Sequence, residues 1–409
     1  MRLLVITNLF FPDRGGGASV FSDLCFGLVQ RGHEVTVYGT YPYYPEWKNK
    51  SGSNLWRRTR ESVQGVDLHR YGLFIPDNPS KLIPRILYEL SFAASLSRSL
   101  FRFRRFDAVM VFCPLAGAVA YSAVRKLFFR EPLWLNVQDI PADAAVASGI
   151  SRFELFNWLG GAVQRWLFNR ANVWSSIAPA MVDRLESMRK KDQPIHFCPN
   201  FLNASMAAII DQCESKVGRP AQKSVRLLYA GNIGKKQGLL EFCRVLSKTD
   251  MDFRFRIHGN GGEAARMRAW VAECNDNRFQ FGDFLDEKAF IEALFDTDFF
   301  VITEKPGVGA SFFPSKLVPS LATGSPVLCV CDPDGPLGTE VQEHNLGICI
   351  EWPQIDSLVP RLQATLQSSD QLEKMQGNAC RRAEFYQRST VIQKIERELH
   401  RLIQGNARE

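Results

Sequence analysis

The residues best suited to take part in chemistry are two adjacent lysines, Lys235 and Lys236, in a loop bordered by glycines. The segment reads Tyr-Ala-Gly-Asn-Ile-Gly-Lys-Lys-Gln-Gly over positions 229–238 and directly follows an apolar run. Two ammonium groups at the carboxyl edge of a sheet can neutralise a leaving diphosphate without a metal ion. The alternative is a solvated basic loop, but the position directly after a strand favours ligand binding.

A second loop follows the first apolar run and contains three consecutive glycines, Gly15 to Gly17. Consecutive glycines let the backbone approach a diphosphate closely, and a following helix directs its N-terminal amides at the anion. The spacing is not the G-x-G-x-x-G of a dinucleotide site, so a nicotinamide cofactor is poorly supported. Taken alone, such a run is more often a flexible turn.

The third segment runs from Glu304 to Val327 and contains the string Pro-Ser-Lys-Leu. Within it, Ser315 is a good helix N-cap candidate and Gly324 is placed to end a short helix. A capped helix N-terminus beside Lys316 is a place where anions bind. The alternative is a plain connection from a loop to a helix.

A fourth candidate is Asp139, which follows the apolar run 133–137. A carboxylate at the carboxyl end of a strand can orient sugar hydroxyls by accepting their hydrogen bonds. Asp139 could equally cap a helix, and its residue type leaves both roles open.

The elements that must position these residues are short apolar runs rich in β-branched and aromatic residues, each followed by a turn and a segment of helical period. This alternation predicts an α/β fold with parallel sheets covered on both faces. The pattern restarts after Asn200, because RLLYAGN echoes the opening RLLVITN. We therefore expect two Rossmann-like domains facing each other across a cleft. The predicted strands are 2–9, 34–38, 107–112, 133–137, 225–229, 253–258, 298–303 and 326–330.

Domain limits follow from this repeat. We expect a first Rossmann-like domain over 1–205, a linker over 206–224 and a second domain over 225–385. Residues 386–409 should form a helix that can cross back to the first domain.

The composition of the 409-residue chain, 45% hydrophobic and 23% charged, excludes a disordered, collagenous or coiled-coil protein. Ten cysteines without any C-x-x-C pair argue against structural zinc and a disulfide framework, and indicate a reducing compartment. The N-terminus lacks a signal-peptide pattern, and the longest apolar stretch, 108–124, is too short and too interrupted to span a membrane. These features predict a cytoplasmic protein.

Positive charge is concentrated in the first half, where residues 1–200 contain 25 Lys and Arg against 16 Asp and Glu. This asymmetry indicates contact with a polyanion.

Segments 81–106 and 153–170 each combine an aromatic stripe with arginines, as helices at a membrane surface do. The alternative is that both stripes pack on the sheet. Nucleic acid is disfavoured because no recognised binding module accompanies the arginines. The stripe of the first segment is Leu87, Leu90, Ala94 and Phe101, and that of the second is Phe156, Leu159, Val163 and Trp166.

Four strings together resemble the family 4 glycosyltransferases, two-domain nucleotide-sugar enzymes of the GT-B fold. The closest resemblance is to the branch for bacterial exopolysaccharide and O-antigen, which includes colanic-acid-type transferases. The strings are F-x-P…G-G, V-Q-D…D-A-A, Y-x-G-N-x-G-x-K-Q-G and P-S-K-L…L-A-x-G-x-P-V, in that order along almost the whole chain.

The resemblance implies a retaining sugar transferase that needs no metal and no cofactor. The first domain would bind the acceptor and the second the nucleotide sugar, with UDP favoured over GDP. The acceptor would be a glycan on a polyprenyl diphosphate, at the inner face of the cell membrane with its anionic surface. The catalytic residues implied are Asp139, Lys235 and Lys236. The substrate-binding residues implied are Gly16, Gly17, Asn232, Glu304, Ser315, Lys316, Leu317 and Glu340.

The chain also departs from the family. Two family glutamates correspond to Ser311 and Pro319 here, and a proline side chain cannot bond ribose hydroxyls. Glu340 is our guess for that contact. The usual arginine after the second-domain glycine is Asn232, and the usual lysine is Gln237, which shifts the phosphate role to the adjacent lysines.

Two alternatives remain beside a metal-independent transferase. One is a catalytically inactive GT-B scaffold of a polysaccharide assembly complex, since fold does not guarantee turnover. The other is a metal-dependent transferase that uses Asp332-Pro-Asp334 or Asp296-Thr-Asp298, although one such pair supplies few of the oxygen ligands that a metal needs.

Overall fold

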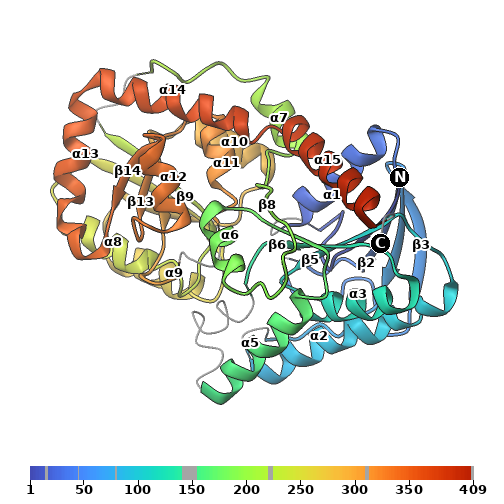
Figure 1. The fold of residues 1–409 in the computed structure, drawn as a ribbon. Helices are drawn as coiled ribbons and strands as arrows, with labels where there is room; N and C mark the ends of the chain where they lie inside the picture. Colours follow the sequence, from blue (N-terminus) through green and yellow to red (C-terminus); the bar gives the residue numbers. More distant parts are fainter. Residues whose placement is uncertain are drawn as a thin grey trace. The chain divides into compact units, whose positions relative to one another are not determined.

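The structure, a computed structural model, describes residues 1–13, 17–44, 46–78, 81–140, 154–219, 224–308 and 313–406. The chain forms two compact units, Met1–Asn200 with Arg388–Glu409, and Phe201–Gln387 (Figure 1). Each unit contains one sheet whose strands alternate with helices along the chain. This confirms the predicted α/β fold with two parallel-sheet domains.

The first unit has an eight-stranded sheet in the order β3-β4-β2-β1-β5-β6-β7-β8. Its pairings are parallel except that of the edge strand β3, which runs antiparallel to β4. The central strands are buried along almost their whole length, as expected for a sheet covered on both faces. The strands are β1 (Arg2–Ile6), β2 (Glu34–Thr40), β3 (Arg58–Val63), β4 (Val66–Tyr71), β5 (Ala108–Cys113), β6 (Leu133–Val137), β7 (Val173–Ser176) and β8 (Ile195–Phe197).

Helices α2, α3 and α5 of the first unit pack in sequence, α2 against α3 and α3 against α5 (Figure 1). Within the described residues, no helix is at once long enough and apolar enough to cross a bilayer. The helices of this unit are α1 (Ala18–Gln30), α2 (Leu82–Ser97), η1 (Leu100–Arg102), α3 (Ala116–Phe129), α5 (Glu154–Phe168), α6 (Pro179–Glu186) and α15 (Arg388–Asn406).

The stripe predicted for segment 81–106 is not packed on the sheet; Phe101 lies in η1 and its other members lie on α2. Leu87 is 48% exposed, and Leu90 and Phe101 are also exposed, whereas Tyr88 and Phe92 are fully buried. The alternative that this stripe packs on the sheet is therefore wrong. The helix buries the neighbouring stripe, and its arginine-flanked apolar side chains face solvent.

The C-terminal helix α15 belongs to the first unit, where it lies beside α1 (Figure 1). Arg388 donates from Nε to Asp23 Oδ1 at 2.9 Å, and Glu396 accepts from Arg31 Nε at 2.7 Å. The same Glu396 contacts His33 Nε2 at 2.8 Å. Ion pairs about two turns apart on α15 thus fasten this helix to α1 and the residues that follow it.

The second unit has an all-parallel six-stranded sheet in the order β11-β10-β9-β12-β13-β14. Its core includes Phe242 of α8 packed edge-on against Phe255 of β10, with ring centroids 5.8 Å apart. The strands are β9 (Val225–Asn232), β10 (Phe253–Asn260), β11 (Phe279–Gly282), β12 (Phe299–Thr303), β13 (Val327–Val330) and β14 (Gly347–Ile350). The helices are α7 (Ala204–Ile210), α8 (Leu239–Ser247), α9 (Ala264–Glu273), α10 (Glu287–Phe295), α11 (Leu317–Ala322), α12 (Pro336–Glu343), η3 (Trp352–Ser357), α13 (Leu358–Gln367) and α14 (Ser369–Phe385).

The range 206–224, expected as a linker, contains most of α7. Asn203 caps this helix by accepting from the Met206 amide at 2.8 Å, and its side chain donates to Glu287 at 3.0 Å. Helix α7 therefore packs on α10 as part of the second unit.

Candidate functional site

The lysine loop connects the carboxyl end of β9 to the start of α8. Gly238 begins the helix with φ of +63°, a left-handed conformation that L side chains rarely adopt. A Cβ at this position would lie 2.9 Å from the Trp352 ring. The Gly234 amide donates to Gln237 Oε1 at 3.0 Å, which closes the loop on itself. Local sequence therefore fixes the loop that presents the two lysines.

A cavity of about 170 Å³ lies beside this loop. Its charged lining consists of three cations, Lys235, Arg266 and Lys305, and two carboxylates, Glu241 and Glu263. Each carboxylate is engaged, because Lys305 contacts Glu241 at 2.9 Å and Arg266 contacts Glu263 at 3.2 Å. Lys235 is exposed and has no ion pair within the described residues. The cavity therefore has one ammonium group available for an anionic ligand.

Lys236 is held by the loop that follows β12. The Lys305 amide donates to the Lys236 carbonyl at 2.8 Å. Next to Lys305, Glu304 is buried, and its Oε1 has no hydrogen-bond partner in the described structure. Burial raises the pKa of the Glu304 carboxyl to about 8, with Asp332 adding to the rise and Lys236 opposing it. At neutral pH this group is a protonated acid that can donate one hydrogen bond and accept another.

Asn232 is the last residue of β9, directly before the lysine loop, and it is exposed. The Tyr229 hydroxyl donates to its backbone carbonyl at 2.6 Å. The next amide, that of Ile233, donates to the Asn260 carbonyl at 2.8 Å. The structure thus brings Asn232, Lys235, Lys236 and Glu304 to one edge of the second sheet, as the parallel fold predicts.

The Pro-Ser-Lys-Leu segment differs from expectation. Helix α11 has Lys316 at its N-cap without a side-chain capping bond, so the prediction that Ser315 caps it is wrong. The Lys316 ammonium lies 4.3 Å from the centre of the Phe290 ring. Burial lowers the pKa of Lys316 to about 8, against the opposing charge of Glu287. Leu317 has a fully buried side chain, and its amide donates to the Pro314 carbonyl at 3.0 Å.

Glu340 lies in an internal ion-pair cluster. Its carboxylate accepts from Arg382 Nε at 2.6 Å and from the Tyr386 hydroxyl at 2.7 Å. The side chain is buried on α12. The guess that Glu340 contacts ribose is therefore withdrawn, because both oxygens of its carboxylate already accept bonds from within the second unit.

In the first unit, Gly16 lies outside the described residues and Gly17 precedes α1 as its N-cap residue. A Cβ at Gly17 would lie 2.1 Å from the Phe21 ring, so this glycine is required for packing. The same loop carries Asp13, which accepts from the amides of Tyr43 and Tyr44 at 3.0 and 3.1 Å. Burial raises the pKa of Asp13 to about 6.

A network of polar groups lies where β1 and β2 end. Asn8 donates to the hydroxyls of Tyr43 and Tyr88 at 2.9 and 2.7 Å, and these hydroxyls are 2.6 Å apart. Next to Tyr88 on α2, Glu89 accepts from the Gly117 amide at 3.1 Å. Burial raises the pKa of Glu89 to about 7, and Arg85 opposes the rise.

Asp139 follows β6 at this same edge of the sheet, and its carbonyl accepts from Cys113 Sγ at 3.7 Å. Burial raises the pKa of the Cys113 thiol well above its ordinary value, and the charges of Glu89 and Asp139 add to the rise. Both carboxyl groups therefore lie near Cys113 at the end of β5.

Sequence reasoning missed Asp13, Tyr88 and Glu89. Asp13 precedes the three glycines in the loop after β1, and the rule that ligands bind beyond strand carboxyl ends could have selected it. Tyr88 and Glu89 carry no comparable signal, because they lie in mid-helix and reach the sheet edge only through packing of α2 on α3.

Three of the four aspartates of the two D-x-D pairs are engaged within the second unit. Asp296 and Asp298 contact Arg226 at 2.7 and 2.8 Å, and Asp332 accepts from the Gly307 amide at 2.7 Å. Among the described residues, groupings with metal-ligand spacing are formed by Cys329, Cys331 and Cys349, and by His33, Glu396 and His400. Neither includes an aspartate of these pairs, so the metal-dependent alternative gains no support from them.

Two family models match consecutive parts of the chain. The model described as "Glycosyl transferase 4-like domain" matches residues 15–200, and "Glycosyl transferases group 1" matches residues 212–382. The chain is also 26% identical over 379 residues to the putative colanic acid biosynthesis glycosyl transferase WcaI of Escherichia coli K12, covering 90% of this chain and 92% of that protein.

Solved structures share the fold. Sucrose-phosphate synthase from Thermosynechococcus elongatus is 14% identical with a TM-score of 0.74, covering 99% of each chain. Anabaena HepE in complex with UDP-glucose is 14% identical with a TM-score of 0.67, covering 98% of this chain and 99% of that one. WaaG, a glycosyltransferase of lipopolysaccharide biosynthesis, has a TM-score of 0.66 at 13% identity, covering 96% and 98%. The chain belongs to the family 4 glycosyltransferases of the GT-B fold and resembles their exopolysaccharide branch.

Proposed function

We propose that this glycosyltransferase moves a sugar from a nucleotide-sugar donor to a lipid-linked glycan with retention of anomeric configuration. The observation that carries the proposal is the loop between β9 and α8, where Lys235 has no ion pair in the described structure and lines a cavity at the sheet edge. The solved HepE complex with UDP-glucose, which has the same fold, supports a UDP-sugar donor.

Lys235 and Lys236 act on the leaving group. Cleavage of the bond between the anomeric carbon and the diphosphate oxygen puts negative charge on the diphosphate, and the acceptor hydroxyl oxygen takes its place on that carbon. Fixed ammonium groups stabilise this charge more in the transition state than in the bound donor, which lowers the barrier. No metal ion is required in this scheme.

Glu304 orients the donor. A buried carboxyl oxygen without a hydrogen-bond partner is costly, and a donor hydroxyl would supply that partner. Because its pKa is raised to about 8, Glu304 enters the reaction as a neutral acid and adds no negative charge beside the diphosphate. Asn232, Ser315 and Lys316 remain proposed donor contacts, although Lys316 must leave its position over Phe290 to reach an anion.

The first unit provides the acceptor side. Asp139 contacts the transferred sugar or the acceptor, and Gly16 and Gly17 approach the diphosphate through their backbone. Glu89 joins this set because its raised pKa of about 7 lets it exchange a proton near neutrality.

The proposal also includes the membrane. The acceptor glycan is carried by a lipid, and the protein associates peripherally with the anionic membrane surface at the cytoplasmic face. Large apolar side chains are exposed on α2, α3 and α5, which pack against one another, and on residues 101–103 after α2. Exposed apolar side chains rimmed by arginines are typical of a membrane-binding surface. We name this set the apolar helix face; its members are Ile83, Leu87, Leu90, Phe101, Phe103, Val124, Leu127, Phe128, Trp158, Val163 and Trp166.

A panel of nucleotide sugars tests the donor assignment. A bound donor raises the melting temperature, since it binds the folded state alone. We expect UDP-sugars to raise it and GDP-sugars to have less effect, with the Lys235→Ala/Lys236→Ala variant giving a smaller shift. A protein that binds no nucleotide sugar and releases no sugar would instead support the inactive scaffold.

A further inference from the structure

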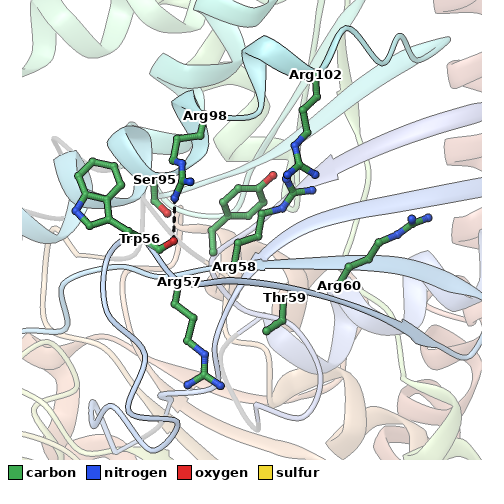
Figure 2. A pocket seen from close by; sticks show the side chains of 9 residues that line it. Trp56, Arg57, Arg58, Thr59, Arg60, Ser95, Arg98 and Arg102 are labelled. Atoms are coloured by element: carbon green, nitrogen blue, oxygen red, sulfur yellow. Dashed lines mark hydrogen bonds between the residues drawn. The ribbon is translucent and has the colours of Figure 1, made fainter.

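A cavity of the first unit is lined by residues of the edge strand β3 and of the end of α2. It has a volume of about 430 Å³ (Figure 2). Five arginines and no carboxylate occur among its described lining residues, which are Trp56, Arg57, Arg58, Thr59, Arg60, Tyr71, Ser95, Arg98 and Arg102. We name this cavity the arginine pocket.

The backbone explains how the arginines converge. On β3, Arg58 and Arg60 are two residues apart and share one face of the strand. Arg58 pairs in register with Tyr71 of β4, and its guanidinium lies 5.2 Å from the Tyr71 ring centre. Arg98 and Arg102 come from the end of α2 and from η1. Figure 2 shows the side chains of Arg58 and Arg102 extending toward each other across the pocket.

Four of the five guanidinium groups have no carboxylate partner within the described residues. Arg60 is the exception, since it contacts Asp67 at 2.6 Å. Arg98 donates to the Trp56 carbonyl at 2.9 Å, Arg57 donates to the Ser51 carbonyl, and Arg58 contacts His69, so these contacts orient the groups without neutralising them. Like charges gathered in one pocket repel each other unless an anion binds among them.

We propose that the arginine pocket binds the phosphate of an anionic lipid headgroup. Guanidinium groups match phosphate oxygens with paired hydrogen bonds, which an isolated ammonium group cannot do. The inference rests on the membrane association proposed above and adds a defined headgroup site to it.

Exposed aromatic side chains, one lining the pocket and two next to Arg102 in the chain, favour a lipid over a soluble phosphate. Trp56 is 59% exposed, and Phe101 and Phe103, which flank Arg102 in the chain, are 80% and 84% exposed. Aromatic side chains beside cationic ones suit the boundary between headgroups and acyl chains. A soluble phosphate would gain nothing from these exposed rings.

Vesicle binding by the full-length protein tests the pocket. The probes are vesicles of phosphatidylcholine alone and of phosphatidylcholine with an equal amount of phosphatidylglycerol. The pocket variant is Arg98→Gln/Arg102→Gln, and its matched control is Arg105→Gln/Arg130→Gln, which removes two exposed arginines of the same unit outside the pocket. A third variant, Arg98→Lys/Arg102→Lys, keeps the charge and loses the paired hydrogen bonds.

We expect binding to need phosphatidylglycerol, and the pocket variant to bind about tenfold or more weakly. The control should lose about threefold or less, and the lysine variant should behave like the glutamine variant rather than the wild type. Equal losses in the pocket variant and its control, or full binding by the lysine variant, would show general surface attraction and overturn the proposal. If Arg98→Gln impairs folding, Arg102→Gln alone serves, because only the backbone amide of Arg102 is bonded, to the Ser99 carbonyl, and its side chain makes no hydrogen bond or ion pair with the described residues.

Inorganic diphosphate in solution distinguishes the source of the phosphate. If it binds the wild type and not the pocket variant, while anionic vesicles bind both equally, the ligand is a soluble phosphate and the lipid assignment fails. Donor binding in the same preparations separates this result from the proposed reaction. Pocket variants should keep the melting shift with UDP-sugar, whereas failure of the transferase proposal would abolish that shift in the wild type.

Discussion

The Lys305 amide donates to the Lys236 carbonyl at 2.8 Å, which ties the loop after β12 to the loop after β9. This bond holds Glu304, the residue before Lys305, next to the lysine loop. A neutral acid and two ammonium groups thereby come to one edge of the second sheet.

Gly238 should be irreplaceable for stability of the lysine loop. Gly238→Ala places a Cβ against the Trp352 ring at a φ of +63°, and we expect it to cost about 1–3 kcal/mol of unfolding free energy. The matched control is Gly377→Ala, in the interior of α14 with open space around it, which should stabilise by about 0.5–1 kcal/mol. Denaturant unfolding of both variants measures the difference, and equal effects would refute the loop geometry.

Glu304 should make stability depend on pH. Its folded pKa, about 8, lies above the ordinary value of 4.5, so the folded state holds a proton that the unfolded state has released between these values. Stability conferred by this proton is present below pH 4.5 and is lost as the pH rises toward 8. Glu304→Gln, which mimics the protonated acid, should therefore melt at a progressively higher temperature relative to wild type from pH 5 to pH 8. A constant difference across that range would contradict the raised pKa.

Glu340 should matter for stability and not for the donor. Glu340→Ala leaves Arg382 and the Tyr386 hydroxyl without their partner, at a cost of about 1–3 kcal/mol. Unfolding free energy and UDP-sugar affinity, measured on one preparation, separate the two roles. Reduced donor affinity in a fully stable variant would restore the ribose assignment.

The apolar helix face should supply much of the membrane affinity. Leu127→Ser/Phe128→Ser on α3 removes two exposed apolar side chains, and each can contribute about 1.5–3 kcal/mol when buried in a bilayer. We expect at least a tenfold loss in vesicle co-sedimentation. Phe284→Ser, an exposed apolar residue of the second unit, is the control and should leave binding unchanged. Equal binding by both variants and the wild type would place the membrane contact elsewhere.

The fold was predictable where strands are buried and apolar. Runs such as 107–112 and 225–229 correspond to β5 and β9, because continuous apolar strands are required by a sheet covered on both faces. Strand β3, Arg-Thr-Arg-Glu-Ser-Val, was not predictable from hydrophobicity, since an antiparallel edge strand faces solvent and carries charge. The arginine pocket was missed for the same reason.

Of the site, residues in loops directly after strands were predictable, and those that depend on packing were not. Asn232 ends a strand of one parallel sheet and Lys235 and Glu304 follow strands of it, so topology alone brings them to one edge. Ser315 was misjudged as a cap because α11 starts one residue later than its residue type suggests. Glu340 was misjudged because its partners, Arg382 and Tyr386, are distant in sequence and only the folded helices bring them together.

The central claim is that Lys235 and Lys236 stabilise the departing diphosphate without a metal ion. Sugar release from the donor, followed with excess chelator, tests it in the wild type and in Lys235→Ala/Lys236→Ala. We expect the wild type to keep its turnover and the variant to lose about 10²–10³-fold at an unchanged melting temperature. Loss of wild-type turnover on chelation, or unchanged turnover in the variant, would contradict the claim.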